Sequence, residues 1–349
     1  MGFLSKIINT PLSAVLRFFA DIFGGSFAAS VFMFTLLINV ILIPLSIKSQ
    51  KASVQQLRIK PKMDDIKKRY GDDRQKLAEA QQKLYRDENI SMSGGCLPMF
   101  IRLALMLCIY YLIMSPLTFL EKVDSDKIST VTTTISAAVE DLSDKDKTEY
   151  KDFTETWGKK GGYKELPLIK VLDEHFDEIA KIVPAKEYKK IESDLKEIKK
   201  AHDNSDIRYN LGSIDLTEKP NFDINIFAKY QTIWLIPIFA FLAQMLTSII
   251  SMFINKKNNP DAPTMAGMML TMPLISLFLG FTFPGGVGFY WICSSLIGGL
   301  IQSAVQLYYG PAKMLANQRI KELKARADFE KKQIEKSEQA ATEPESDNK

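Results

Sequence analysis

Cysteine and histidine are scarce in this chain of 349 residues. It contains three cysteines, Cys96, Cys108 and Cys293, and two histidines, His175 and His202. Cysteines without close spacing exclude a disulfide scaffold and a cysteine-based zinc ribbon. Both histidines stand among charged residues, so we expect them at the surface and expect neither a metal nor a cofactor.

A strong excess of charge is missing as well. The formal net charge is +4, which by itself does not indicate a nucleic-acid-binding protein, and we expect no specific nucleic acid sequence as a partner. The 15 prolines and 18 glycines are too few for a collagen-like or low-complexity chain.

Charged residues are almost absent from four long stretches. Residues 27–47, 230–255 and 262–312 contain no Asp, Glu, Lys or Arg, and residues 96–120 contain only Arg102. Because a bilayer needs about 20 apolar residues per helix, these stretches predict an all-α polytopic membrane protein rather than a soluble one with five buried helices. The predicted transmembrane helices are residues 27–47, 96–120, 230–255, 264–283 and 287–309.

The charges between the spans predict the orientation. Residues 48–93 carry twelve Lys and Arg against seven Asp and Glu, whereas residues 121–229 carry nineteen against twenty-four. The positive-inside rule places the first segment in the cytoplasm and the second outside. We therefore expect a multi-pass protein of the bacterial plasma membrane, with an outside N-terminus (1–26), a cytoplasmic loop (256–263) and a cytoplasmic tail (310–349).

The segments outside the spans are predicted to be helical. Residues 11–24 form an amphipathic pattern, with Pro11 in the first turn, that fits either the outer membrane surface or packing on the bundle. Periodic apolar positions predict two helices in the 121–229 insert, at about 165–182 and 184–202. A charged helix is expected in the tail to about Lys336.

Residues 48–95 predict a cytoplasmic helical hairpin. Gly71 ends one helix, Asp72 and Asp73 can cap the next, and Pro61 is expected to kink the first arm or to start a new turn. The basic surface is either a solvated face or a contact surface for RNA, the ribosome or anionic lipid. Its proposed contact residues are Lys60, Lys62, Lys67, Lys68, Arg69 and Arg74.

Arg102 is the ionisable residue within the predicted spans. Asn39 precedes Lys48 by nine residues and Arg102 follows Ser93 by nine, so both lie about 13 Å from the cytoplasmic ends of two antiparallel helices. We predict that Arg102 lies in a functional site beside Asn39. The alternative is that Arg102 extends to the cytoplasmic headgroups.

Several motifs, in order along the chain, resemble those of YidC-type membrane protein insertases. They are Ile43-Pro44-Leu45, Ile59-Lys60-Pro61-Lys62-Met63, Tyr70-Gly71-Asp72-Asp73, Gly94-Gly95-Cys96-Leu97-Pro98, Tyr110-Tyr111, Leu211-Gly212-Ser213-Ile214-Asp215-Leu216, and Phe283-Pro284-Gly285-Gly286 followed by Tyr290-Trp291. The resemblance covers about residues 10–120 and 210–310. It is to the short bacterial form, which lacks a large extracytoplasmic β-domain.

The resemblance implies an insertase and chaperone without a chemical step. In that family a hydrophilic groove, open to the cytoplasm and to lipid, takes up the polar end of a nascent helix while its apolar part enters the bilayer. The implied partners are nascent membrane proteins and the lipid bilayer, with the ribosome and the Sec translocon as further candidates. The predicted groove residues are Thr35, Asn39, Arg102, Gln244, Tyr290, Trp291, Ser294 and Ser295.

The chain departs from the family pattern at the groove cation. The family's groove arginine precedes the Pro-Leu pair by five residues, where this chain has Asn39, and Arg102 stands where relatives carry a glutamine. We therefore hypothesise that the cation has moved from the first span to the second. A small-molecule transporter or channel is the alternative function, although internal repeats and a charged relay are missing. An enzyme would need convergent catalytic groups.

Overall fold

The computed structural model describes residues 3–88, 97–158, 164–220, 231–258 and 266–342. Some side chains within these ranges, that of Arg102 among them, lie outside the description. So do most of the predicted 256–263 loop, the end of the predicted hairpin at 89–95, residues 221–229 of the insert and the last residues of the tail.

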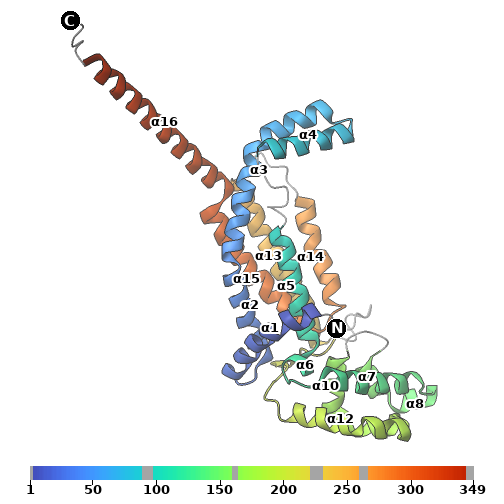
Figure 1. Cartoon of the computed structure of the whole chain (residues 1–349). Helices are drawn as coiled ribbons and strands as arrows, with labels where there is room; N and C mark the ends of the chain where they lie inside the picture. The colour runs from blue at the N-terminus through green and yellow to red at the C-terminus, as the bar shows by residue number, and fades with distance from the viewer. Residues whose placement is uncertain (1–2, 89–96, 159–163, 221–230, 259–265, 343–349) are drawn as a thin grey trace. The chain divides into compact units, whose positions relative to one another are not determined.

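The described chain is built almost entirely from helices (Figure 1) and divides into two compact units. Unit 1 comprises Met1–Leu42, Phe100–Ser251 and Thr264–Ile301, and unit 2 comprises Ile43–Met99, Met252–Pro263 and Gln302–Lys349. The helices and strands that lie in unit 1, wholly or for the most part, are α1 (Phe3–Ile22), α2 (Phe27–Ile41), α5 (Leu97–Met114), α6 (Pro116–Phe119), α7 (Ser125–Glu140), α8 (Asp144–Glu149), α9 (Lys151–Trp157), α10 (Glu165–Glu174), α11 (Phe176–Ile182), α12 (Ala185–Asp203), β1 (Asn210–Leu211), β2 (Ile214–Asp215), η1 (Thr232–Trp234), α13 (Leu235–Asn258), α14 (Ala266–Gly280) and α15 (Gly285–Tyr309). Unit 2 contains α3 (Ile43–Tyr70), α4 (Arg74–Asp87) and α16 (Pro311–Thr342).

Prolines divide two of the predicted spans. In the first, α2 ends at Ile41 and α3 begins at Ile43 and continues into the predicted hairpin arm. In the second, α5 ends at Met114 and α6 begins at Pro116. Proline lacks a backbone N–H and disfavours helical geometry in the residue before it, so Pro44 and Pro116 fit the first turn of a new helix better than the interior of a long one.

Helices long and apolar enough to cross a membrane are present in the described residues. Thr232–Ile254 and the stretch beginning at Gly285 satisfy this criterion, and Phe27–Ile41 satisfies it together with Ile43–Lys51. The apolar stretch Ala104–Met114 of α5 is shorter. The described helices thus include two or three of spanning length, and the predicted number of five stays a prediction.

Glycines allow α15 to lie very close to α13. A Cβ atom on Gly285 would come within 2.6 Å of Ile233 Cδ1, and Cβ atoms on Gly288 and Gly299 would clash with Ile236 and Thr247. Gly285 and Gly299 are as far apart in sequence as their contact residues Ile233 and Thr247, and both pairs follow the same chain direction. Helices α13 and α15 therefore run parallel. Backbones this close require residues without a Cβ.

A second line of glycines places α2 on another side of α15. A Cβ on Gly286 would lie 3.3 Å from Phe27 Cε1, and one on Gly298 would lie 3.0 Å from Asn39 Oδ1. Phe27 and Asn39 are as far apart along α2 as the two glycines are along α15, so α2 is also parallel to α15. The adjacent Gly298 and Gly299 therefore face α2 and α13, respectively.

We expect the Gly299→Leu substitution to destabilise unit 1. Its side chain would overlap Thr247, and overpacking of this kind costs about 1–3 kcal/mol or more. Thermal unfolding of the purified protein should show a lower Tm. Leu300→Ala is the control, because Leu300 is the next residue and is 61% exposed; an equal loss in both variants would contradict the close α13–α15 contact.

Residues 205–218, which we name the strap, connect the start of α2 to the start of α15. Arg208 N–H donates to Gly25 O at 2.7 Å, and Phe27 N–H donates to Arg208 O at 3.1 Å. At the other end Gly286 N–H donates to Leu216 O and Gly285 N–H to Glu218 O, both at 2.7 Å. The antiparallel hairpin β1–β2 lies between these contacts, with Gly212 at φ +62° in its turn. The first N–H groups of two helices thus gain acceptors.

The N-terminal helix α1 packs on other helices of unit 1. Leu16 and Ala20 are buried on one face, whereas Phe18 is 59% and Ile22 58% exposed on the other. Contacts with α2 and α6 confirm packing on the bundle, and the membrane-surface position of the other face stays a prediction. Pro11 lies inside α1, not in its first turn. That prediction is wrong, because the loss of one backbone hydrogen bond does not end a helix whose residues before and after the proline, Asn9 and Leu16, are buried.

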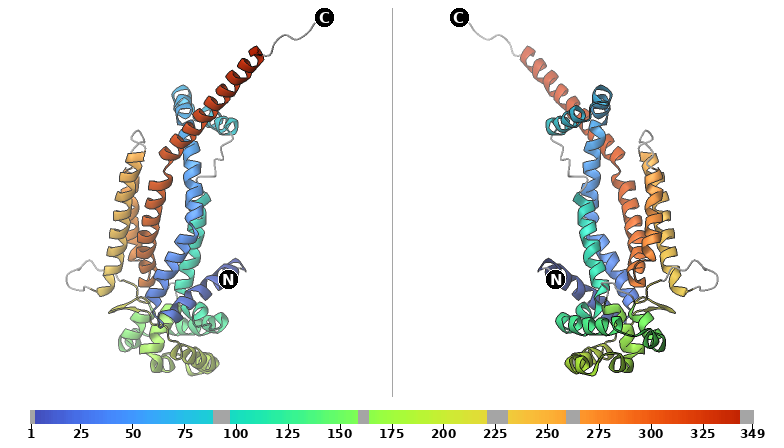
Figure 2. Two further views of the ribbon diagram at one scale, coloured as in Figure 1. Left: turned by 90° about the vertical axis from the view of Figure 1, so that its left-hand side faces the viewer. Right: turned by 90° about the vertical axis from the view of Figure 1, so that its right-hand side faces the viewer.

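The insert is a helical part of unit 1 whose buried side chains continue the core of that unit. Both views of Figure 2 show its helices, in green, gathered beside α1. The two predicted helices are present, but the first is divided at His175 into α10 and α11. Helices α7 to α9 and the β-hairpin were not predicted. Buried Ile128, Val131 and Ile135 face the core from α7 at helical spacing.

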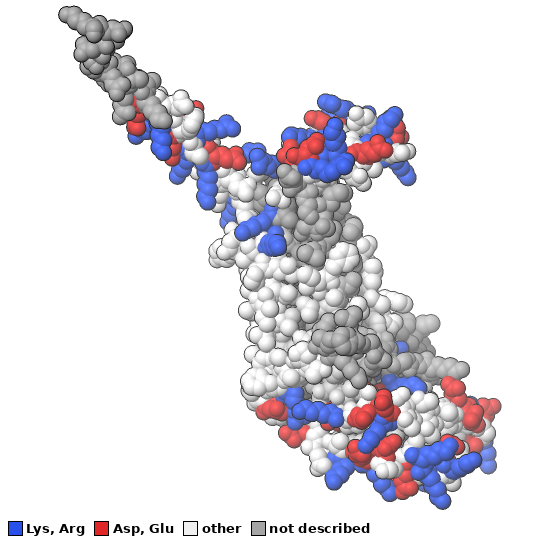
Figure 3. Space-filling view, viewed as in Figure 1, with Lys and Arg blue, Asp and Glu red and all other residues white. Residues whose placement is uncertain are grey.

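In unit 2, α3 and α4 form a hairpin. Tyr70 ends α3, and the Asp73 side chain accepts hydrogen bonds from Gln75 N and Lys76 N at 3.1 Å, as predicted for a cap. Pro61 lies within the continuous α3. Figure 3 shows Lys, Arg, Asp and Glu crowded over α4 and α16, and over the insert helices of unit 1, while the apolar helices of unit 1 present an almost uncharged surface on this face.

Candidate functional site

Asn39 occupies a defined position between α2 and α15. Its Nδ2 donates to Thr35 O at 2.9 Å one turn earlier, and its Oδ1 is directed at the Gly298 backbone. The side chain is half-buried. An amide oxygen next to a glycine remains available as an acceptor for an approaching donor.

Arg102 lies on α5 at nearly the same depth as Asn39. Near the other end of α5, Ile113 Cγ2 lies beside Gly286, 3.1 Å from where a Cβ would be. Arg102 precedes Ile113 by eleven residues, and Gly298 follows Gly286 by twelve. At 1.5 Å per residue, Arg102 and the Asn39–Gly298 contact both lie about 17–18 Å from that level. The side chain of Arg102 is outside the described residues, so its predicted meeting with Asn39 stays a prediction.

The other predicted groove residues fall into two groups. Thr35 and Tyr290 are 1% and 7% exposed, and Thr35 Oγ1 donates to Val31 O at 2.6 Å. Gln244, Trp291, Ser294 and Ser295 are partly exposed. The structure thus leaves some polar groups of α13 and α15 accessible but buries the Thr35 and Tyr290 side chains.

These residues lie near the contacts between the helices. Ser294 lies one turn before Gly298, on the side of α15 that faces Asn39, and Ser295 one turn before Gly299, on the side that faces α13. Gln244 lies one turn before Thr247. Trp291 packs edge-on against Phe283, and Phe283 packs edge-on against Tyr110 of α5. The aromatic contacts therefore connect α5 to α15.

The proposed contact residues of the hairpin lie on α3 and at the start of α4. Lys62, Lys67, Lys68, Arg69 and Arg74 are exposed and Lys60 is half-buried. Lys62 forms an ion pair with Glu88, and the hydrogen bond from Lys62, together with its positive charge, lowers the pKa of Glu88. The remaining basic side chains form an accessible surface, which carries no further specificity by itself.

A buried ionic network joins the insert to the α5–α6 corner. Glu121, whose side chain is 0% exposed, accepts from His202 Nδ1 at 3.0 Å and from Tyr209 OH at 2.9 Å. His202 Nε2 contacts Asp173 Oδ1 at 3.1 Å. Burial alone would lower the pKa of His202, but the two carboxylates raise it to about 9. The prediction that His202 is a surface residue is wrong, because partners distant in sequence enclose it.

A second buried carboxylate joins the same surfaces. Glu165, on α10, accepts from Thr118 Oγ1 at 2.6 Å and Thr118 N at 3.0 Å. Its burial raises its pKa to about 7. Glu121 and Glu165 thus both connect the insert to the segment around α6.

The insert becomes less stable as the pH rises from about 6 to 9. His202 has a raised pKa, so the stabilisation by its protonated form is complete below pH 6.5 and is lost as the pH rises through about 9. Glu165 also has a raised pKa, so its ionisation between pH 4.5 and about 7 makes the folded insert less stable. We expect a combined loss of about 2–4 kcal/mol. Hydrogen exchange of α10 and α12 amides, corrected for intrinsic rates, should rise over this range. In His202→Gln the rise above pH 7 should disappear, and an unchanged profile would contradict the assignment.

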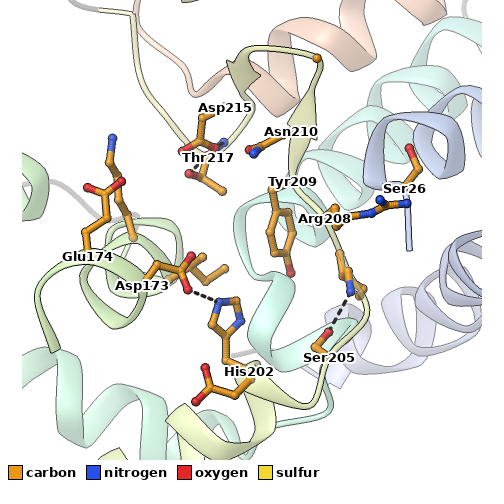
Figure 4. Close-up of a pocket in the computed structure, with 15 residues that line it drawn as sticks. Ser26, Asp173, Glu174, His202, Ser205, Arg208, Tyr209, Asn210, Asp215 and Thr217 are labelled. Atoms are coloured by element: carbon orange, nitrogen blue, oxygen red, sulfur yellow. Dashed lines mark hydrogen bonds and ion pairs between the residues drawn. The ribbon is translucent and has the colours of Figure 1, made fainter. Parts of the chain in front are cut away.

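A polar cavity of about 530 Å³ lies next to this network. Side chains of α10, the end of α12 and the strap line it, and Figure 4 shows Asp173 joined to His202 on one side, with Tyr209 beside them. The cavity is separate from the predicted groove residues. Within the described ranges no group of three or more His, Cys, Asp or Glu side chains is placed to hold a metal ion.

The fold and the apolar helices define an all-α protein integral to the membrane. The sequence model of a family described as 60Kd inner membrane protein matches residues 18–311 of the chain. The chain belongs to this family, and the resemblance seen in the sequence is confirmed.

Curated relatives match a shorter part of the chain. It is 39% identical over 120 residues to a membrane protein insertase YidC of Alkalihalophilus pseudofirmus, covering 32% of this chain and 48% of the relative. It is 33% identical over 113 residues to a membrane protein insertase YidC 1 of Listeria monocytogenes, and this match covers 31% of this chain and 39% of the relative. It is 33% identical over 108 residues to a membrane protein insertase YidC of Hahella chejuensis, and this match covers 31% of this chain and 19% of the relative. The matched segments span less than half the length of these relatives.

Proposed function

We propose that this chain is a membrane protein insertase, which passes nascent transmembrane segments into the bilayer without a chemical step. The family and the names of its relatives support this function. The single structural observation that carries it is the group of partly exposed polar side chains, Asn39, Ser294 and Gln244, at contacts between apolar helices. Polar groups at membrane depth are costly and therefore indicate function.

We propose five spans, formed by α2 with the start of α3, α5, α13, α14 and α15. The parallel directions of α2, α13 and α15 support this plan, because the first, third and fifth spans of an alternating chain must run the same way. The proposed topology has an outside N-terminus, an outside insert and a cytoplasmic hairpin and tail, in accord with their charges.

The proposed groove is lined by α2, α5, α13 and α15. A client's polar end enters it from the cytoplasm, where water and polar side chains replace its hydration. The strap ties together the ends of α2 and α15 on the insert side, which keeps that end closed to the client. Burial of the client's apolar segment in lipid, at about 25 cal/mol per Å², drives its release, and no nucleotide is required.

Arg102 is the proposed groove cation, and Asn39 and Gln244 provide its polar surroundings. A positive charge at this depth attracts acidic residues of a translocating segment. The proposed clients are nascent membrane proteins. The hairpin residues that are proposed to receive the client or its ribosome are Lys60, Lys62, Lys67, Lys68, Arg69 and Arg74. The Sec translocon is a further proposed partner.

Reconstitution tests the function directly. Purified protein in lipid vesicles should protect the translocated end of a short membrane protein from added protease, without nucleotide. Vesicles without protein are the control for spontaneous insertion. Protection no higher than in that control would overturn the proposal, and uptake of small solutes by the same vesicles would favour a transporter.

A further inference from the structure

An exposed apolar stripe follows α16. Ile320, Leu323 and Ile334 are 50%, 64% and 57% exposed. Ala316 and Ala327 complete the stripe, because at 100° per residue all five positions fall within about 60° around the helix, whereas Phe329, 62% exposed, lies on the opposite face. Exposed aliphatic side chains in such a line indicate a surface that is covered by a partner.

Basic side chains border the stripe on both sides. Lys313, Lys324 and Lys331 follow one edge, and Arg319 and Arg326 follow the other, which also carries Glu330. All five basic residues are exposed, and Figure 3 shows Lys and Arg side chains along this helix. Long basic side chains beside an apolar stripe can place their stems on apolar surface and their charges on phosphates.

The beginning of α16 is suited to the edge of a bilayer. Only Gly310 separates the end of α15 from Pro311, and Lys313 Nζ donates to Leu307 O at 2.8 Å. Tyr308 is 79% and Tyr309 44% exposed. Tyrosines at the end of an apolar helix lie at the level of the lipid headgroups. If α15 spans the bilayer, α16 therefore starts at the headgroups.

We propose that the 316–334 part of α16 binds the anionic lipid surface of the leaflet at which α15 ends. The stripe lies at the boundary between headgroups and acyl chains, and the bordering Lys and Arg contact lipid phosphates. Each such basic residue strengthens surface binding about fivefold. An RNA partner would leave the apolar stripe without a role. The inference rests on α15 as a span, one part of the proposed function, and not on the insertion of clients.

The test uses the full chain in nanodiscs, with Cys96, Cys108 and Cys293 replaced by serine. A polarity-sensitive fluorophore is attached to Leu323→Cys or, as a matched control on the opposite face, to Ala325→Cys. With phosphatidylglycerol present, the label at 323 should emit at shorter wavelength and resist quenching by iodide, whereas the label at 325 stays accessible. Adding Lys324→Gln and Arg326→Gln should weaken the bound state about 25-fold.

Three outcomes would overturn the proposal. Equal signals from positions 323 and 325 would show that the stripe is not buried in lipid. A shift of the same size in phosphatidylcholine alone would remove the anionic requirement. A shift that depends on added ribosomes, or on two copies per nanodisc, would assign the stripe to another partner. A failure of client insertion leaves this measurement unaffected, so it distinguishes the two proposals.

Discussion

Replacing His202 with leucine is expected to destabilise the insert by about 3–5 kcal/mol, because a buried carboxylate then loses its charged partner. Glu121 has a fully buried side chain and would retain only the hydrogen bond from Tyr209. Hydrogen exchange should rise in α10, α12 and the strap.

His175→Leu is the matched control for this prediction. The His175 side chain is 14% exposed and its Nδ1 lies 3.0 Å from Glu178 Oε1. The Glu178 side chain is 32% exposed, so water can solvate its charge when His175 is replaced. The double variant Glu121→Leu/His202→Leu should recover much of the loss, since it removes the unpaired charge. Equal effects of His202→Leu and His175→Leu would contradict the buried ion pair.

Arg102→Gln is expected to reduce insertion of clients with acidic tails about ten- to hundredfold. A charge pair about 5 Å apart at an effective dielectric constant of about 20 contributes about 3 kcal/mol, and each 1.4 kcal/mol corresponds to a factor of ten. Clients with neutral tails should be affected little. The ratio of the two clients' insertion rates in proteoliposomes measures the effect.

A swap tests whether the cation can act from either helix. Asn39→Arg combined with Arg102→Gln places the arginine at position 39, in the first proposed span. Because positions 39 and 102 lie at nearly the same depth, we expect the double variant to regain most of the preference for acidic tails. Full activity of Arg102→Gln alone would refute the electrostatic role.

Local signals in the sequence predicted local structure well. The first hairpin helix ends just before Gly71, and the side chain of Asp73 caps the next helix, as the sequence predicted. The breaks before Pro44 and Pro116 could have been predicted from proline geometry alone.

Features that depend on distant partners could not be predicted. His202 meets Glu121 only after the insert folds onto α6, and the two residues are 81 positions apart. The Leu211–Leu216 motif was noted in the sequence, but the backbone hydrogen bonds that hold the strap to α2 and α15 use groups that any sequence provides, so its partners could not be predicted. Helix α7 was missed because serine and threonine reduce its helical pattern, although Val131 and Ile135 are fully buried.

The predicted groove could be placed only in part. The depths of Arg102 and Asn39 follow from helix rise once Ile113 and Gly286 are known to be in contact. The burial of Thr35 and Tyr290 depends on packing among helices, which composition does not determine.

Photocrosslinking of client to chain tests the central claim, that polar positions between α2, α5, α13 and α15 form the client's path. A photoreactive amino acid is placed at Ser294 or Trp291, and ribosome-bound nascent chains of a membrane protein are supplied. Leu274, on α14 and 57% exposed, is the lipid-facing control. We predict adducts with the client's apolar segment several-fold above those at Leu274. Adducts at Ser294 and Trp291 no more frequent than at Leu274 would contradict the groove.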